Sequence, residues 1–293
     1  MLLTKKLRQK AVAILVIWSF FVSILAPSAS FASADDGLSV TQADSAEQLV
    51  NEMLGSGITA SNIVRTGNPV AFGIFSGGMD VIGFDQGIIL STGKAADVVG
   101  PNNSNSKSTS NGQPGDADLT ALAGLPTNDA AILEFDFVPN GDSVSFQYVF
   151  SSEEYNEYAN DAFNDTFAFF VNGENVAIIP DTHPPIPVSI NTVNGGNPIG
   201  VNAQNPDYYI NNDAASAAQL NTQMDGLTVV MSVSVGVKAG ETNHIKIAIA
   251  DGGDDSYDSN VFIKAGSFND RPARPGEVTI IGKDEREDTI DIY

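Results

Sequence analysis

Residues 130–150 read AAILEFDFVPNGDSVSFQYVF, two runs in which apolar and polar side chains alternate, joined by Pro139–Asp142 (PNGD). Alternation with a period of two is typical of a β-strand with one buried face. Asn-Gly between two such runs is a strong sign of a tight hairpin turn. The stretch therefore predicts a β-hairpin made by Ala130–Val138 and Ser143–Phe150.

Further apolar runs, bounded by Gly, Asn and Pro, recur on both sides of this stretch, and Asn172–Asn175 (NGEN) predicts a second hairpin. Many short strands without regular strand–helix alternation predict a mainly β fold, an antiparallel β-sandwich of jelly-roll-like type. The other predicted strands are Ile58–Thr66, Ala71–Phe75, Gly87–Thr92, Thr166–Val171, Val176–Ile179, Val188–Val193, Leu227–Val237, Ile245–Ala250 and Val261–Ala265.

One N-terminal helix and short peripheral helices complete the prediction. Asp44 is the expected N-cap, with Glu47 three residues later, and the apolar residues of Leu49–Leu54 form a face that packs on the sheet. Asp116–Ala123 and the Ala-rich Asp213–Leu220 are the expected short helices. The intervening stretch of residues 100–115, GPNNSNSKSTSNGQPG, has no large apolar side chain, which predicts an exposed loop.

The N-terminus resembles a secretory signal peptide. A basic start precedes the apolar run Ala11–Leu25, which is shorter than the roughly 20 residues that span a bilayer, and Ala32–Ala34 (ASA) fits a cleavage site. We expect a secreted, extracellular or cell-surface protein with no membrane span after cleavage. The predicted organisation is a signal peptide over 1–34, a β-sandwich domain over 35–268, a linker over 269–276, and a strand-forming tail or incomplete second module over 277–293.

The charge of the chain limits its partners. Removal of residues 1–34 leaves 10 of the 14 Lys and Arg residues with all 36 Asp and Glu residues, a net charge of −26. Nucleic acids and anionic membranes bind clustered basic residues, so neither is an expected partner. Divalent cations are expected partners. The chain has no cysteine, so a large core, metal ions or both must hold the exported protein together.

Two acidic segments lie between strand-like runs: Phe150–Gly173 (FSSEEYNEYANDAFNDTFAFFVNG) and His244–Phe268 (HIKIAIADGGDDSYDSNVFIKAGSF). Crowded carboxylates on strand-connecting loops supply the oxygen ligands that Ca²⁺ requires, although the spacing is not that of an EF-hand. We therefore expect Ca²⁺ to stabilise these loops, with solvated acidic loops as the alternative. The candidate metal ligands are Glu153, Glu154, Asp251, Asp254, Asp255 and Asp258.

A carbohydrate-binding module is an alternative function. Tyr155 and Tyr158 have the aromatic rings that stack on sugars, and Asn164 and Asp165 are polar groups nearby in the sequence. The competing interpretation treats both tyrosines as half-buried residues of the sandwich.

A polysaccharide hydrolase is the third alternative. It would need two carboxylates about 5–10 Å apart, such as Glu153 or Glu154 with Asp251 or Asp255, and nothing in the sequence fixes that distance. The chain has no G-x-S-x-G or H-E-x-x-H motif, and with no cysteine it has no thiol nucleophile. We therefore expect no enzymatic activity.

Four segments in order resemble the choice-of-anchor L domain of bacterial surface proteins. They are GIILSTG at 87–93, TNDAAILEFDFVPNGDSVSFQYVFSSEEYNEY at 127–158, FNDTFAFFVNG at 163–173, and the second acidic segment at 244–268. The resemblance extends over about Ser45–Phe268. It implies an exported surface module, named for its various C-terminal anchors rather than for an activity.

The sequence thus predicts a secreted or cell-surface, non-catalytic module that Ca²⁺ stabilises and that acts in adhesion or the extracellular matrix. The expected partners are a divalent cation and either a surface polysaccharide or another copy of the chain.

Overall fold

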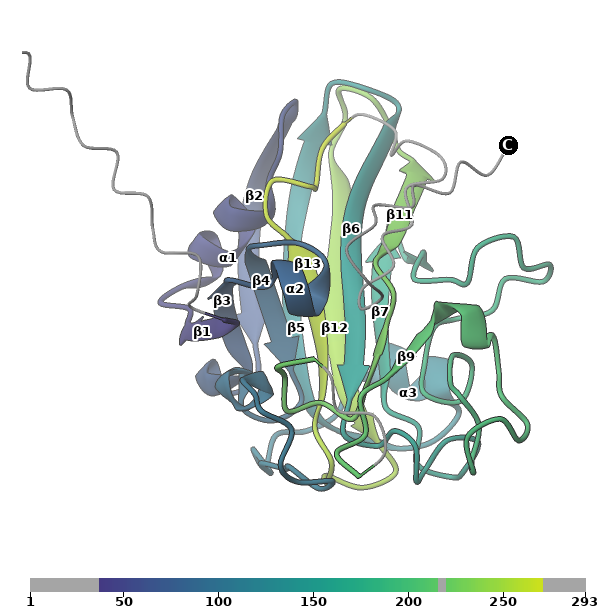
Figure 1. The fold of residues 1–293 in the computed structure, drawn as a ribbon. Coiled ribbons are helices and arrows are strands. Elements are labelled where there is room, and N and C mark those ends of the chain that lie inside the picture. Colours follow the sequence, from purple (N-terminus) through teal and green to yellow (C-terminus); the bar gives the residue numbers. More distant parts are fainter. Residues whose placement is uncertain (1–36, 216–219, 271–293) are drawn as a thin grey trace, which may run out of the picture. The chain divides into compact units, whose positions relative to one another are not determined.

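A computed structural model describes residues 37–215 and 220–270, which form two facing antiparallel β-sheets (Figure 1). The predicted signal peptide over 1–34, the tail over 277–293, and all of the predicted linker after Asp270 lie outside the described residues. The expectation of a mainly β, antiparallel sandwich with few helices is confirmed.

The larger sheet contains eight of the described strands in the order β1-β3-β4-β13-β6-β10-β9, and β11 also pairs with β6. The run predicted as one strand over Leu227–Val237 is divided into β10 and β11, which pair with successive parts of β6. The strands are β1 (Ser39–Gln42), β3 (Phe72–Ser76), β4 (Gly87–Ser91), β6 (Ser143–Ser152), β9 (Tyr209–Asn211), β10 (Gly226–Thr228), β11 (Met231–Gly236) and β13 (Ser259–Lys264).

The smaller sheet contains five described strands in the order β2-β5-β12-β7-β8. The residues predicted as a strand over Val188–Val193 instead form a turn with an isolated bridge from Ser189 to Thr166. The strands are β2 (Ile58–Thr66), β5 (Thr127–Pro139), β7 (Thr166–Val171), β8 (Glu174–Asn175) and β12 (Asn243–Gly252).

Short helices pack against the sheets, and the first of them adds Leu49, Val50 and Met53 to the core between the sheets. Helix α1 (Ala46–Met53) is capped by Ser45 rather than by Asp44, because the Ser45 hydroxyl accepts a hydrogen bond from the Gln48 amide. Helix α3 (Ala117–Ala123) packs Leu119 on the smaller sheet, as predicted. The described residues of Asp213–Leu220 are not helical. The remaining helical segments are α2 (Met79–Ile82) and the 3₁₀ turns η1 (Pro69–Ala71), η2 (Ala95–Val98) and η3 (Pro206–Tyr208).

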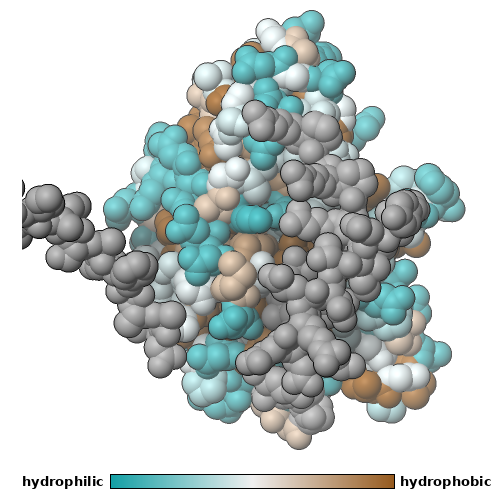
Figure 2. All heavy atoms as spheres, turned by 45° about the horizontal axis from the view of Figure 1, so that its top comes forward, coloured by the Kyte–Doolittle hydropathy of each residue, from teal (hydrophilic) through white to brown (hydrophobic). Residues whose placement is uncertain are grey.

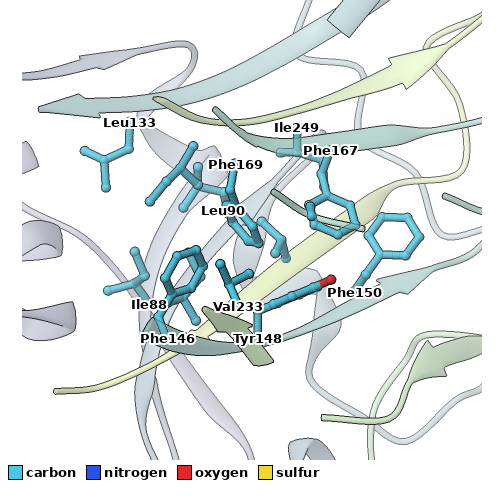
Figure 3. Close-up of a cluster of buried hydrophobic side chains, with 14 of the residues drawn as sticks. Ile88, Leu90, Leu133, Phe146, Tyr148, Phe150, Phe167, Phe169, Val233 and Ile249 are labelled. Atoms are coloured by element: carbon cyan, nitrogen blue, oxygen red, sulfur yellow. The ribbon is translucent and has the colours of Figure 1, made fainter. Parts of the chain in front are cut away.

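The described part of the molecular surface in Figure 2 is a mixture of hydrophilic residues and smaller groups of hydrophobic residues. Large apolar side chains gather instead between the sheets, where Figure 3 shows the rings of Phe146, Tyr148 and Phe150 facing Phe167 and Phe169. The Phe146 and Phe169 centroids are 4.8 Å apart in an edge-to-face contact, a favourable geometry for aromatic rings. Alternating side chains from both sheets therefore build one aromatic core.

The two Asn-Gly turns have different roles. Asn172 and Gly173, with φ of 51° and 89°, join β7 to β8 in a two-residue hairpin, so the predicted hairpin is present. Its second strand is Glu174–Asn175 rather than the predicted Val176–Ile179, which has only an isolated bridge from Ile178 to Pro187. The Pro139–Asp142 turn, by contrast, joins β5 in the smaller sheet to β6 in the larger one. The hairpin predicted there is wrong, because the two strands face each other across the core instead of pairing edge to edge.

Three connections cross from sheet to sheet at one end of the sandwich, the lower end in Figure 1. They are residues 92–126 between β4 and β5, residues 153–165 between β6 and β7, and residues 253–258 between β12 and β13. Their flanking strands are neighbours, since β13 pairs with both β4 and β6 while β12 pairs with both β5 and β7. The three crossings therefore lie side by side.

Candidate functional site

The acidic segments meet because each is one of these crossings. Ser152, at the end of β6, is paired with Ser259, at the start of β13, and Ala250 of β12 is paired with Thr166 of β7. Beyond these pairs the chain leaves both sheets at the same place, so the side chains of the crossings are enclosed there. The buried carboxylates at this end form two groups: an inner layer of Glu154, Asp165 and Asp251, and an outer layer of Glu153, Asp225 and Asp258.

The inner layer ties the two sheets together through Asp165. Its Oδ1 accepts a hydrogen bond from the Gly252 amide of β12 at 2.9 Å, and its Oδ2 accepts one from the Ser259 hydroxyl of β13 at 2.6 Å. Asp251 lies beside Asp165, and its Oδ1 is buried without a hydrogen-bond partner.

Burial governs the ionisation of this inner layer. It raises the pKa of Asp165 to about 7, and it raises the pKa of Asp251, where the charge of Asp165 adds to the effect. Burial and the charge of Asp165 raise the pKa of Glu154 to about 10. Glu154 thus stays protonated at neutral pH in the absence of a cation.

The outer layer is a row of three carboxylates under the polar loop. Asp225, Glu153 and Asp258 each use one oxygen to hold residues 102–113, which we call the strap. The other oxygen of each is buried and has no hydrogen-bond partner. The bonds are Asn102 Nδ2 to Asp225 Oδ1 (2.7 Å), Lys107 N to Glu153 Oε2 (2.9 Å), and Thr109 N to Asp258 Oδ1 (3.0 Å).

The strap continues in the same manner beyond the row. The amides of Asn111 and Gln113 donate to the two oxygens of the buried Asp129, and the Ser110 hydroxyl donates to Asp255 at 2.7 Å. Alternate strap residues from 106 to 113 are exposed and half-buried. The predicted exposed loop is therefore an extended segment whose alternate amides bind carboxylates.

Burial again raises the pKa values in the outer row. The pKa of Glu153 is raised to about 9, chiefly by burial and then by the charges of Asp225 and Asp258, against the lowering effect of the Lys107 amide. Burial raises the pKa of Asp225 to about 7 and that of Asp258 to about 7. In the described part of the chain, no basic side chain forms an ion pair with any of these acids.

Comparison with known proteins identifies the domain that carries this end. The family model of the choice-of-anchor L domain matches residues 39–269. The chain belongs to the choice-of-anchor L domain family. Searches of the curated proteins and of the solved structures each found no match. The family indicates an extracellular, surface-associated module, and within the described residues no helix has the length and apolar character to cross a membrane.

The candidate metal ligands of this choice-of-anchor L domain differ in burial and in the layer to which they belong. Glu153, Glu154, Asp251 and Asp258 are buried, whereas Asp254 is half-buried and Asp255 is exposed. Glu153 and Asp258 lie in the outer layer, and Glu154 and Asp251 in the inner one. In the described residues no three acidic or histidine side chains are grouped in metal-binding geometry.

The sequence analysis missed Asp225, Asp129 and the role of the strap. Asp225 stands alone before a short apolar run, and Asp129 lies inside a strand, so neither belongs to an acidic cluster in the sequence. Only the pairing of distant strands brings them to the same end. Their one local signal is that each is a single acid just before a short apolar run.

The residues proposed for sugar binding do not form one surface. Tyr155 is fully buried between Phe150 and Tyr209, with its hydroxyl bonded to the Val193 carbonyl at 2.7 Å, so its ring is not available for stacking. Asn164 accepts a bond from the Asn191 amide, and Asp165 belongs to the inner layer. Tyr158 alone keeps a half-exposed ring, in contact with Phe163 and Tyr257.

Proposed function

We propose that this protein is a non-catalytic module of the cell surface that acts in adhesion or in the extracellular matrix, and that Ca²⁺ stabilises the crossing end of its sandwich. One observation carries the proposal: the crossings bury several carboxylates with raised pKa values and no basic partner in the described residues. A hard cation stabilises such a group of charges, and oxygen ligands are those that Ca²⁺ prefers.

The same burial supports a binding or structural role over hydrolysis. Glycoside hydrolysis needs two carboxylates on either side of a bound sugar. Glu153, Glu154 and Asp251 are enclosed by the crossings and the strap, while Asp255 is exposed and bonded to Ser110. This arrangement leaves the suggested carboxylate pairs without a shared exposed face.

Thermal unfolding of the purified protein with Ca²⁺ and with a chelator tests the cation. A ligand that binds only the native state raises the melting temperature, by RT ln(1 + [L]/Kd) in free energy. We expect a higher melting temperature in Ca²⁺. An equal melting temperature in chelator would contradict Ca²⁺ stabilisation, and adhesion of protein-coated beads to each other or to purified surface polysaccharide then tests the adhesive role by itself.

Carbohydrate binding is a second candidate that one observation favours. Tyr158, Phe163 and Tyr257 are half-exposed, and the Tyr158 ring centroid lies 5.3 Å from that of Phe163 and 5.1 Å from that of Tyr257. Aromatic surfaces of this kind stack on sugar rings. Saturable sugar binding that is lost in Tyr158→Ala supports this function, whereas the absence of binding in glycan arrays contradicts it.

A further inference from the structure

In each side chain of the outer carboxylate row, the two oxygens have different hydrogen-bonding environments. In Asp225, Glu153 and Asp258, one oxygen accepts a hydrogen bond from the strap and the other has no partner, although the side chains are at most 2% exposed. A buried polar atom without a partner is costly, and a buried charge more so. Three such oxygens along one segment indicate a site where a bound cation supplies the missing partner.

We propose that the unpartnered oxygens of this row bind a divalent cation, Ca²⁺, between the strap and the strand ends, and that the bound cation fastens the strap to the sandwich. This inference rests on the proposed function, and it assigns the cation to the outer layer rather than the inner one. The core ligands are Glu153 and Asp258, with Asp225 as the adjoining carboxylate.

The inner layer is the weaker cation site because its central acid is already satisfied. Both oxygens of Asp165 accept hydrogen bonds, so a cation there would have to displace the donors of Gly252 and Ser259. Asp251 Oδ1 is buried without a partner, but it is a single such oxygen, whereas the outer row offers three.

The row packs closely against the backbone beside it. Gly93 follows β4 directly against Asp258, where a Cβ would come within 1.8 Å of the unpartnered Oδ2. The carboxylate therefore fits there only because residue 93 has no side chain. Ca²⁺ takes six to eight oxygens, so backbone carbonyls and water supply those that the row does not.

The central part of the strap is held by polar contacts, among them those of Lys107 and Thr109 with Asp97, rather than by apolar packing. Residues 102–113 contain no large apolar side chain, and the Lys107 amide and carbonyl bond to Glu153 and to the Asp258 amide. Segments with few apolar contacts open locally at low cost. A cation bound to Glu153 and Asp258 holds the strap closed and opposes that opening.

Limited trypsin digestion of the purified protein at pH 8 reports this opening directly. We expect cleavage after Lys107 in chelator, and about tenfold slower cleavage when Ca²⁺ is present at ten times its Kd, because cleavage tracks the population of the open strap. Lys238 is an internal control: it is exposed between β11 and β12, at the opposite end of the sandwich, and its cleavage rate should not change.

Isosteric variants locate the ion. Glu153→Gln and Asp258→Asn keep an oxygen for the strap amide but remove the charge, so we expect both to lose Ca²⁺ protection at Lys107 while unfolding in chelator at or above the wild-type temperature. Asp255→Asn, also an acid bonded to the strap but exposed, should keep full protection. Full protection in Glu153→Gln and Asp258→Asn would overturn the proposal.

The wild-type protein separates this inference from the proposed function without any variant. A Ca²⁺-dependent rise in melting temperature with unchanged cleavage at Lys107 overturns the strap site but leaves Ca²⁺ stabilisation standing. The absence of both effects overturns both.

Discussion

Strand β6 leads from the aromatic core to the buried acidic end of the sandwich, and the side chains in these two regions have different requirements. Phe146, Tyr148 and Phe150 lie in the aromatic core, where any well-packed apolar neighbour satisfies a side chain. Glu153 and Glu154, directly beyond the end of the strand, are as deeply buried, but each of their oxygens needs a specific donor or ion. The stability that the core contributes should therefore not change with pH or ions, whereas the stability of the crossing end should depend on both.

The pH dependence of the metal-free protein is the largest effect expected from this contrast, since several acids contribute. The pKa values of Asp165, Asp225 and Asp258 are raised to about 7, and that of Glu153 to about 9, from unfolded values near 4. The folded state therefore binds protons more tightly, and the free energy of unfolding falls as pH rises from about 5 to 9.

Calorimetric melting temperatures in chelator across this pH range measure that dependence. In Glu153→Gln, the melting temperature should change less with pH near pH 9, while its change with pH near pH 7 should stay as in the wild type. A melting temperature that rises from pH 5 to pH 9 would contradict the raised pKa values.

Truncation of the aromatic core should be the most damaging single substitution. Phe169 is fully buried, and its ring centroid is 4.8 Å from Phe146 and 4.9 Å from Tyr148. Phe169→Ala should cost about 3–5 kcal/mol in urea unfolding, because it leaves a cavity. The loss should be the same with Ca²⁺ and with chelator. Val64→Ala, at a side chain that is 51% exposed, is the control, with little change expected.

Removal of the inner carboxylate should cost less. Asp165→Ala leaves the Gly252 amide and the Ser259 hydroxyl without their acceptor, and each buried unsatisfied group costs about 1–3 kcal/mol. Asp165→Asn, which retains one carbonyl oxygen for Gly252, should lose less. Amide hydrogen exchange at Gly252 and urea unfolding measure the two effects. If Asp165→Ala is more stable than wild type, the buried charge outweighs the hydrogen bonds.

An ion-pair group on the outer face of the smaller sheet should matter least. Lys246 Nζ lies 2.7 Å from both Asp116 Oδ2 and Asp118 Oδ2, and the side chains of Lys246, Asp116 and Asp118 are 12%, 11% and 62% exposed. Lys246→Met should therefore cost about 1–2 kcal/mol, more than a fully exposed pair, and the part due to Asp118 should shrink at high salt. Urea unfolding at low and high salt checks this, with the exposed Lys238→Met as a control. A loss comparable to that in Asp165→Ala would contradict the assignment of a minor role.

Local pattern was sufficient to predict most strands and the fold class. Ile58–Thr66 and Thr166–Val171 have the predicted limits, because alternation and turn residues act within a few positions of the chain. The Asn172-Gly173 hairpin and α3 follow from equally local rules. The family was also recognisable from ordered segments, and its model covers residues 39–269.

The sequence by itself determined that strands form, the limits of several of them, and that carboxylates gather beyond their ends. Tertiary structure alone decided which strands pair, because Asn140-Gly141 is compatible with arms that pair in one sheet or face each other across a core. Burial of opposed aromatic rings favours the second arrangement. It also brings Asp225 beside Glu153 and Asp258 and lays the strap over them, contacts between residues far apart in the chain that no local pattern encodes.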